Sequence, residues 1–334
     1  MSNFYITTPL YYVNDKPHIG HAYTTILADV IARHRRIMGD DVHFLTGTDE
    51  HGQKIQEAAS KRDINPKKHV DEYVLRFQKL WKKLNIEYDD FIRTTEKRHT
   101  YRVKELLISF YEKGEIYSAE YEGLYSVSEE RFVTEKEVEE GGFRQVIKLK
   151  EKNYFFKMSK YQEPLINHLK NNPDFIKPES RLNEVLGFLK QPLNDLCISR
   201  PKARLSWGIE IPFDKDYVTY VWFDALLNYV SAVGWNNDEQ NFKKWWPASY
   251  QLIGKDILTT HAVYWPTMLM AANISLPKTI IAHGWWMNDE SKMSKSLGNV
   301  IDPLELIELY GLDSVRYFLM RDMVLGMDAN FNID

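Results

Sequence analysis

The chain of 334 residues contains a single cysteine, Cys197. One cysteine excludes a disulfide within the chain and any metal site built mainly from thiolates. Such scarcity is typical of proteins from a reducing compartment. The sequence also lacks an apolar run long enough to span a membrane, and it begins without a basic leader. We therefore expect a cytoplasmic protein that has no membrane partner.

An excess of positive charge is missing too, because the formal net charge is −4. A nucleic-acid partner would therefore need a locally basic surface, and residues 181–204 offer one concentration of arginine and lysine. A solvated surface explains that segment equally well. Glycine-rich strings of the P-loop and dinucleotide-binding types are also absent. If the protein binds a nucleotide, it must hold the phosphates in another way.

The order of the predicted elements indicates an α/β fold. Residues 4–7 and 42–45 have the composition of strands. Between them, residues 19–39 carry apolar side chains at spacings of three and four, which predicts an amphipathic helix. Another helix is predicted from about Gly52. Because strands alternate with helices, we expect a parallel sheet.

The pattern changes in the middle of the chain. Short strand-like pieces and charged turns, with Glu139–Gly142 as a predicted hairpin tip, indicate an inserted strand-rich domain over residues 116–215. The α/β pattern resumes at Tyr217–Trp222. It continues through a predicted helix over 256–272 and a strand over 279–282.

The string His18-Ile19-Gly20-His21 has the composition of a phosphate-binding helix start. Backbone amides and the helix dipole favour an anion at such a position. Gly20 lets a nucleotide approach the backbone closely, while His18 and His21 can donate hydrogen bonds to phosphate oxygens from one side of the first turn. A histidine pair of this kind standing alone would more often be a surface feature.

A second string, Lys292-Met293-Ser294-Lys295-Ser296, supplies positive charge from a loop that can close over a ligand. Attack by a carboxylate on an α-phosphate builds negative charge on the phosphoryl oxygens and on the departing pyrophosphate. The ammonium groups of Lys292 and Lys295 would stabilise that charge in the transition state. The two strings, in this order, are typical of the class I aminoacyl-tRNA synthetases.

Further stretches resemble the methionyl-tRNA synthetase family over essentially the whole chain. They are Thr8–Tyr12, Gly47–Gly52, Tyr220–Ala225 and Gly254–Ile257, together with His261 and Trp265-Pro266. The resemblance implies an ATP-dependent ligase on a Rossmann-like, doubly wound parallel sheet. Its partners would be methionine, ATP with Mg²⁺, and tRNA(Met), and methionyl-adenylate would be the intermediate.

The resemblance also implies roles for individual residues. Asp49 would bind the substrate ammonium, Asp256 the ribose or ammonium side, and Lys295 the phosphates. A polarizable thioether is well served by aromatic edges and apolar walls. The implied methionine pocket consists of Pro9, Leu10, Tyr12, Asp49, Trp222, Ala225, Tyr229, Ile257 and His261. A weak hydrogen bond from Tyr12 or His261 to the sulfur would help to reject aliphatic side chains of the same shape.

The implied organisation has four parts. They are a first Rossmann half over 1–115, the inserted connective domain over 116–215, a second Rossmann half over 216–282, and the lysine loop with a short helical stem-contact region over 283–334. The family's anticodon-binding helical bundle has no counterpart in the sequence. We therefore expect a catalytic core that forms the adenylate but charges tRNA poorly.

Many members of the family carry a zinc site in the connective domain, and here the sequence departs from the family. Ser126 and Glu129 stand where the first two cysteine ligands would be, after Gly123–Tyr125. Phe143 and Val146 fall where the second pair would be. Structural zinc needs four thiolate or imidazole ligands, so we expect no zinc.

Two other interpretations remain open. A sister synthetase for valine, isoleucine or leucine would carry a large editing insertion, for which 116–215 is too short. A cysteine enzyme would use zinc thiolates, which a single cysteine cannot supply. The second interpretation is an inactive relative that serves as an RNA-binding or scaffolding module, and the intact histidine and lysine strings argue against it. Pyrophosphate exchange with each amino acid in turn separates these possibilities.

Overall fold

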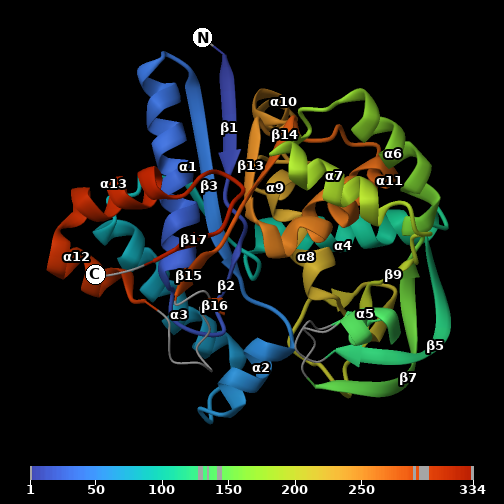
Figure 1. The fold of residues 1–334 in the computed structure, drawn as a ribbon. Coiled ribbons are helices and arrows are strands. Elements are labelled where there is room, and N and C mark those ends of the chain that lie inside the picture. Colours follow the sequence, from blue (N-terminus) through green and yellow to red (C-terminus); the bar gives the residue numbers. More distant parts are fainter. Residues whose placement is uncertain are drawn as a thin grey trace.

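Strands and helices alternate along the chain and build one central parallel sheet covered by helices on both faces (Figure 1). The computed structural model describes residues 2–126, 131–133, 135–140, 145–288, 291–292 and 301–331. The predicted α/β fold with a parallel sheet is confirmed. Among the described helices, none combines the length and the apolar character needed to cross a membrane.

The main sheet has the strand order β2-β3-β1-β13-β14-β8, and β4 also pairs with β3. All of these pairs are parallel. The strands are β1 (Asn3–Thr7), β2 (Tyr11–Tyr12), β3 (Asp41–Asp49), β4 (Asp90–Arg93), β8 (Ile176–Lys177), β13 (Tyr250–Gly254) and β14 (Thr279–His283). β3 pairs with one edge of β1, and β13 pairs with the other edge. The order of the strands along the chain therefore reverses direction at β1. In such sheets, ligands bind beyond the carboxyl ends of the strands at this point of reversal.

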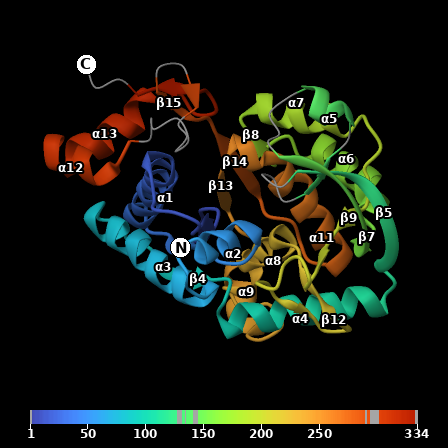
Figure 2. The ribbon, with the colours of Figure 1, turned by 90° about the horizontal axis from the view of Figure 1, so that it is seen from below.

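Two hydrophobic cores lie on the two faces of the sheet because strand side chains alternate in direction. In β1, Tyr5 belongs to one core, while Phe4 and Ile6 belong to the other. The helices around the Phe4 core are α1 (Ile19–Ile37), α3 (Pro66–Lys83), α12 (Pro303–Tyr310) and α13 (Leu312–Asp322). The helices around the Tyr5 core are α4 (Lys97–Glu112), α6 (Gln162–Asn171), α7 (Glu179–Phe188), α8 (Val221–Leu226), α9 (Asn228–Ser231), α10 (Glu239–Trp245) and α11 (Trp265–Ala272). Figure 2 shows the two groups of helices on opposite sides of β13 and β14.

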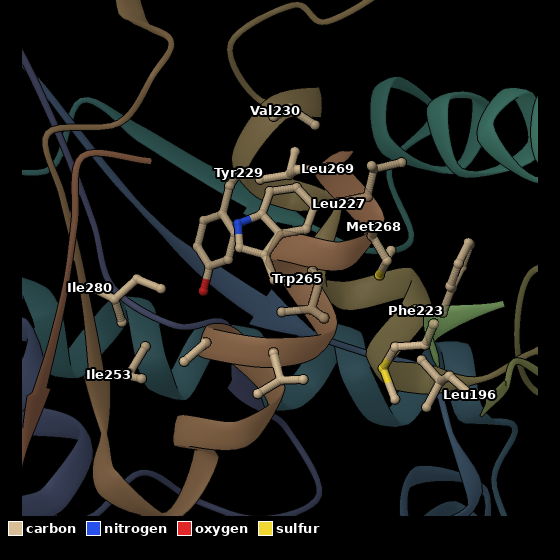
Figure 3. Close-up of a cluster of buried hydrophobic side chains, with 14 of the residues drawn as sticks. Leu196, Phe223, Leu227, Tyr229, Val230, Ile253, Trp265, Met268, Leu269 and Ile280 are labelled. Carbon is tan, nitrogen blue, oxygen red and sulfur yellow. The ribbon is translucent and has the colours of Figure 1, made fainter. Parts of the chain in front are cut away.

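The Tyr5 core contains aromatic side chains from α9 and α11. Tyr229 and Trp265 lie side by side in it, with ring centroids 5.8 Å apart (Figure 3). The hydroxyl of Tyr5 donates to the backbone oxygen of Tyr229 at 2.8 Å. This bond joins the central strand to α9, so the sheet fixes the position of Tyr229.

The middle segment contains a long antiparallel pair of strands. Ile116 lies opposite Phe156 and Ser126 opposite Val146, so β5 and β7 pair along their full lengths. The other elements of the segment are β6 (Arg131–Val133), α5 (Glu135–Glu140), a 3₁₀ turn (Met158–Tyr161), α6 (Gln162–Asn171), α7 (Glu179–Phe188), β9 (Leu196–Cys197), β10 (Ser199–Pro201), β11 (Glu210–Ile211) and β12 (Asp214–Thr219). β5 spans Ile116–Ser126 and β7 spans Val146–Phe156. One strand of the segment, β8, leaves it to join the main sheet.

Two local predictions differ from the structure. The predicted hairpin tip begins with Glu139 and Glu140, which instead end helix α5, while residues 141–142 lie outside the described residues. In the stretch Tyr217–Trp222, where the α/β pattern resumes, β12 ends at Thr219 and α8 begins at Val221.

The second difference concerns the helix predicted over residues 256–272. It is divided into a 3₁₀ turn (Lys255–Ile257), a π-helical turn (Thr260–Tyr264) and α11. Pro266 explains the division, since its missing N–H removes one bond of a regular helix. π-helical turns often occur at functional sites, and this one contains His261.

Four further elements complete the described fold. They are α2 (Gln53–Ser60), β15 (Trp286–Asn288), β16 (Ser291–Lys292) and β17 (Ala329–Asn330). β15 pairs in parallel with β17, which brings the end of the described chain back beside β15. The side chain of Asp302 caps α12 by accepting from the Leu304 amide at 2.9 Å.

Candidate active site

The predicted site residues follow the carboxyl ends of three adjacent strands. Pro9 and Leu10 come after β1, Asp49 is the last residue of β3, and Asp256 and Ile257 come after β13. Since β3, β1 and β13 are neighbours in the sheet, these residues lie at one edge. It is the edge at which a doubly wound sheet binds its ligands.

Tyr229 and His261 form a buried hydrogen-bonded pair. Each side chain is 1 % exposed, and the Tyr229 Oη lies 2.8 Å from His261 Nε2. His261 Nδ1 lies 3.0 Å from the carbonyl oxygen of Ile257, which can only accept. The ring proton therefore sits on Nδ1, and Nε2 accepts from the Tyr229 hydroxyl. Burial lowers the pKa of His261 to about 4, so the imidazole is neutral at neutral pH.

Other predicted pocket residues belong to the same core or pack against it. The Trp222 ring meets the His261 ring edge to face, with centroids 6.0 Å apart. Ala225 is buried one turn later in α8, while Leu10, Tyr12 and Ile257 are partly buried against the Tyr5 core. Aromatic edges and aliphatic carbon thus predominate, and the neutral His261 adds no charge. Such surroundings suit an uncharged, polarizable side chain.

Asp49 lies beside the strand that carries Tyr12. Tyr12 and Asp49 are register partners in β2 and β3, and the Val13 amide donates to the Asp49 carbonyl at 3.2 Å. Two residues earlier in β3, a Cβ on Gly47 would collide with the Ile92 carbonyl and would also press against Leu10. Glycine is therefore required for β4 to approach β3 at this point.

The two histidines of the first string cap α1. His18 is the N-cap residue: its Nδ1 accepts from the Gly20 amide at 3.1 Å, and the His18 amide donates to His21 Nδ1 at 3.0 Å. This is a reciprocal capping box built from two histidines. Because both Nδ1 atoms accept, both rings carry their proton on Nε2 and can act as donors there. A Cβ on Gly20 would lie 3.0 Å from His18 Cε1, so the glycine also makes room for the capping ring.

Residues that flank the two strings meet in space. The Ile19 amide donates to the carbonyl oxygen of Ile301 at 3.3 Å, and Lys16 Nζ lies 3.4 Å from Asp302 Oδ2. Lys292 lies in β16, whereas Lys295 falls outside the described residues. The histidine helix start therefore lies against the residues that follow the lysine loop.

Asp256 is exposed at the carboxyl end of β13. The Trp285 indole donates to Asp256 Oδ1 at 3.2 Å. Lys255 Nζ lies 4.1 Å from the centroid of the same indole and pairs with Asp328 at 2.6 Å. The side chains around Asp256 are thus connected to Asp328, which directly precedes β17.

Sequence reasoning assigned no role to the buried polar network around Asp224. Asp224, fully buried in α8, accepts hydrogen bonds from His51 Nδ1 and His99 Nε2, each at 2.7 Å. One signal was available, because a carboxylate within the apolar run 221–226 demands buried partners. Nothing in the sequence indicated His99, which is 125 residues away from Asp224.

A second missed network surrounds Glu50. Its buried carboxylate accepts from Arg93 Nε at 2.5 Å, from Thr95 Oγ1 at 2.5 Å and from Thr48 Oγ1 at 2.7 Å. The Trp207 indole donates to the Glu50 carbonyl at 2.5 Å. The turn that contains Asp49 is therefore held by hydrogen bonds on both sides of that residue.

Comparison with known proteins now identifies the family. The model of the family described as "tRNA synthetases class I (M)" matches residues 4–142 and 143–334. The chain belongs to this family. A methionine–tRNA ligase from Rickettsia bellii is 52 % identical over 99 % of the chain. Another from Clostridium perfringens is 51 % identical over 98 % of the chain.

Solved structures agree with this assignment. Methionyl-tRNA synthetase of Mycobacterium tuberculosis in complex with methionyl-adenylate superposes with a TM-score of 0.94 at 44 % identity, over 99 % of this chain and 66 % of that one. The apo form of the same enzyme gives a TM-score of 0.83 at 42 % identity, over 100 % of this chain and 64 % of that one. The chain spans 65 % of the Rickettsia relative and 52 % of the Clostridium relative.

Proposed function

We propose that the chain activates methionine with ATP, giving methionyl-adenylate and pyrophosphate. A carboxylate oxygen of methionine attacks the α-phosphorus of ATP. The bond from that phosphorus to the oxygen bridging to the β-phosphorus breaks, and pyrophosphate departs. Mg²⁺ enters as part of the ATP substrate. The observation that carries the proposal is the neutral, buried Tyr229–His261 pair beside Trp222 at the switch point of the sheet.

Methionine binding divides into two contacts in this proposal. Asp49 pairs with the ammonium group and so orients the carboxylate for attack. Trp222, Tyr229 and His261 face the thioether, together with the apolar walls of the pocket. Since His261 is neutral and its Nε2 already accepts from Tyr229, the pocket contributes shape, aromatic edges and weak sulfur contacts.

The phosphates are assigned to the start of α1 and to the lysine loop. His18 and His21 carry their protons on Nε2, and such N–H groups can donate to phosphate oxygens. Lys292 and Lys295 add positive charge as charge builds on the departing pyrophosphate. Asp256 binds the ribose or ammonium side. The chain superposes more closely on the adenylate complex than on the apo enzyme. This supports a backbone conformation that suits methionyl-adenylate.

Pyrophosphate exchange tests the proposal directly. The purified chain is incubated with ATP, Mg²⁺, labelled pyrophosphate and one amino acid at a time. We expect exchange that depends on methionine and is absent with valine, isoleucine, leucine or cysteine. Exchange driven by one of those amino acids would favour a sister synthetase. Absence of exchange with every amino acid would favour a binding or scaffolding role.

Transfer of the methionyl group to the 3′ end of tRNA(Met), initially to the 2′-hydroxyl, completes the proposed reaction. In this account residues 116–215 act as a connective domain and 283–334 as a stem-contact region. The reaction supplies charged tRNA for protein synthesis, and so we place it in the cytoplasm. Aminoacylation of tRNA(Met), compared with a tRNA for another amino acid, tests this second step.

We also infer that the connective domain needs no zinc. Ser126 is buried in β5, opposite Val146, and Glu129 lies outside the described residues. Neither residue type is a thiolate or an imidazole. In the described part of the chain, no group of three or more His, Cys, Asp or Glu side chains could hold a metal ion. Elemental analysis of the purified chain should give far less than one zinc per molecule, and stoichiometric zinc would refute the inference.

A further inference from the structure

Asp224 occupies an unusual position for a carboxylate. It lies in α8, two residues after Trp222 and directly before Ala225, and it is completely buried. Burial raises its pKa, but the charges and hydrogen bonds of His51 and His99 oppose this effect and leave the pKa below its ordinary value. The group is therefore ionised and accepts both hydrogen bonds.

The two histidines come from separate parts of the fold. His51 follows β3, two residues after Asp49, and its Nδ1 donates to Asp224 Oδ2 at 2.7 Å. His99 belongs to α4, and its Nε2 donates to Asp224 Oδ1 at 2.7 Å. The Ser231 hydroxyl of α9 lies 2.9 Å from His99 Nδ1. One carboxylate thus joins the turn after β3 to α8, α4 and α9.

These connections span the proposed methionine site. Asp49 is assigned to the ammonium group at one end of the substrate, and Trp222 faces the thioether at the other. From Asp49 the chain continues for two residues to His51, and the hydrogen bond from His51 to Asp224 leads into α8. Because Glu50 is fixed separately by Arg93, the turn has little freedom to move by itself.

We propose that Asp224 is a positioning residue that sets the spacing between Asp49 and the α8 wall of the pocket, and thereby the length of side chain that is accepted. The inference rests on the proposed function, since it concerns the specificity of the same site. Asp224 touches no substrate in this account. It acts by holding His51 and the turn at a fixed distance from Trp222.

A merely structural role for Asp224 predicts a different outcome. Asp29 provides the matched control, because it is equally buried and its carboxylate accepts from the Glu87 amide at 2.8 Å and from two arginine side chains. These are Arg33 Nε at 2.8 Å and Arg316 Nη2 at 2.6 Å. The control cluster joins α1 to α13 on the opposite face of the sheet. Loss of either carboxylate should lower stability, but only loss of Asp224 should change the choice of amino acid.

The test uses pyrophosphate exchange by the wild-type chain, by Asp224→Asn and by Asp29→Asn. Methionine is compared with ethionine, which is one methylene longer, and with S-methylcysteine, which is one methylene shorter. A single methylene typically changes kcat/KM by about 10- to 200-fold in a rigid pocket. For Asp224→Asn we expect the KM for methionine to rise about tenfold and the preference over both analogues to fall about fivefold or more. The KM for ATP should stay within about twofold.

His51→Ala serves as the second variant if Asp224→Asn does not fold. It leaves Asp224 paired with His99 and removes the connection to the turn, together with the ring contact between His51 and Trp207. We expect the same loss of preference, with partial recovery in His51→Gln, whose amide can donate to Asp224. Asp29→Asn should lower Tm and leave the KM for methionine and the preference unchanged.

The two failures are distinguishable. If the wild-type chain shows no exchange with methionine, the proposed function fails and the inference fails with it. If the wild-type chain exchanges but Asp224→Asn or His51→Ala keeps the wild-type KM and preference, the positioning role alone is refuted. Equal shifts in Asp29→Asn would refute it as well, because they would show a general effect of lost stability.

Discussion

The proposed methionine side and the proposed phosphate side of the site are built in contrasting ways. On the methionine side, Tyr229, His261 and Trp222 come from different elements and meet in a buried cluster. On the phosphate side, His18 and His21 lie in one helical turn, and their contacts with Gly20 and with each other are local. The comparison shows that a local site depends on a few neighbouring residues, whereas a distributed site depends on the whole sheet.

Histidine has opposite roles on the two sides. Burial keeps His261 neutral, with its proton on Nδ1 and its Nε2 accepting from Tyr229. His18 and His21 are only partly buried, and backbone amides place their protons on Nε2 instead. The methionine side therefore presents an uncharged surface, and the phosphate side presents N–H groups that can donate hydrogen bonds. This difference matches a thioether on one side and phosphates on the other.

The largest expected effect is on stability, through the close contact of β3 and β4 beside the methionine side. Gly47→Ala should unfold the chain or cost about 3 kcal/mol or more, since its Cβ would collide with the Ile92 backbone between β3 and β4. Gly187→Ala is the control, because that site in α7 is open and alanine favours a helix. Denaturant unfolding measures both. A Gly47→Ala variant as stable as Gly187→Ala would show that the two strands can separate there.

The next effect concerns the donors on the phosphate side. His21→Ala should reduce the kcat of methionine-dependent exchange about 100-fold, as expected for loss of one donor to a charged transition state. It should also cost about 1 kcal/mol through loss of the cap. Asn65→Ala removes the cap of α3, which accepts from Lys68, and should lose similar stability without lower exchange. Equal rates in the two variants would restrict His21 to a capping role.

The third prediction follows from the neutral His261. Its pKa is about 4 in the fold and about 6.5 in the unfolded chain, so the unfolded chain binds the proton first as pH falls. Stability contributed by this group is therefore complete above pH 6.5 and is lost between pH 6.5 and pH 4. The loss at pH 5 should be about 2 kcal/mol. His261→Gln should show a smaller difference in unfolding free energy between pH 7 and pH 5, and an undiminished difference would contradict the assignment.

The smallest effect tests the Tyr229–His261 hydrogen bond. Tyr229→Phe removes the donor and leaves the buried His261 Nε2 without it, at a cost of about 1–2 kcal/mol. We expect the KM for methionine to rise about tenfold, while the KM for ATP stays within about twofold. Steady-state exchange at varied methionine and varied ATP provides both values. An equal rise in both KM values would mean that Tyr229 acts on the whole fold and has no selective effect on one side.

The sequence predicted the local features better than the distributed ones. The helix after the first strand, the parallel sheet and the start of α1 at His18 follow from periodicity and short strings, and the structure contains them. The capping by the His18 and His21 rings was not predicted, because a histidine side chain can serve a backbone amide as readily as a phosphate. The division of helix 256–272 escaped prediction because helical periodicity does not distinguish a π turn from an α turn.

The buried carboxylate network could be predicted only in part. Asp224 stands out in an apolar run, and a charge in such a place requires partners. Its partners, however, lie far from it in the sequence, and no local pattern points to His99. The β8 strand is a similar case, since a two-residue strand within 116–215 has too little pattern to be assigned to the main sheet. Contacts between residues far apart in the sequence determine both features.

The central claim is that the chain itself forms methionyl-adenylate at the carboxyl ends of β3, β1 and β13. The most direct measurement is a single-turnover reaction in which stoichiometric chain, methionine, ATP and Mg²⁺ react with pyrophosphatase present and tRNA absent, followed by mass spectrometry of the bound product. The account predicts close to one methionyl-adenylate per chain and essentially no adenylate with leucine. No adenylate from methionine, or equal amounts from methionine and leucine, would contradict it.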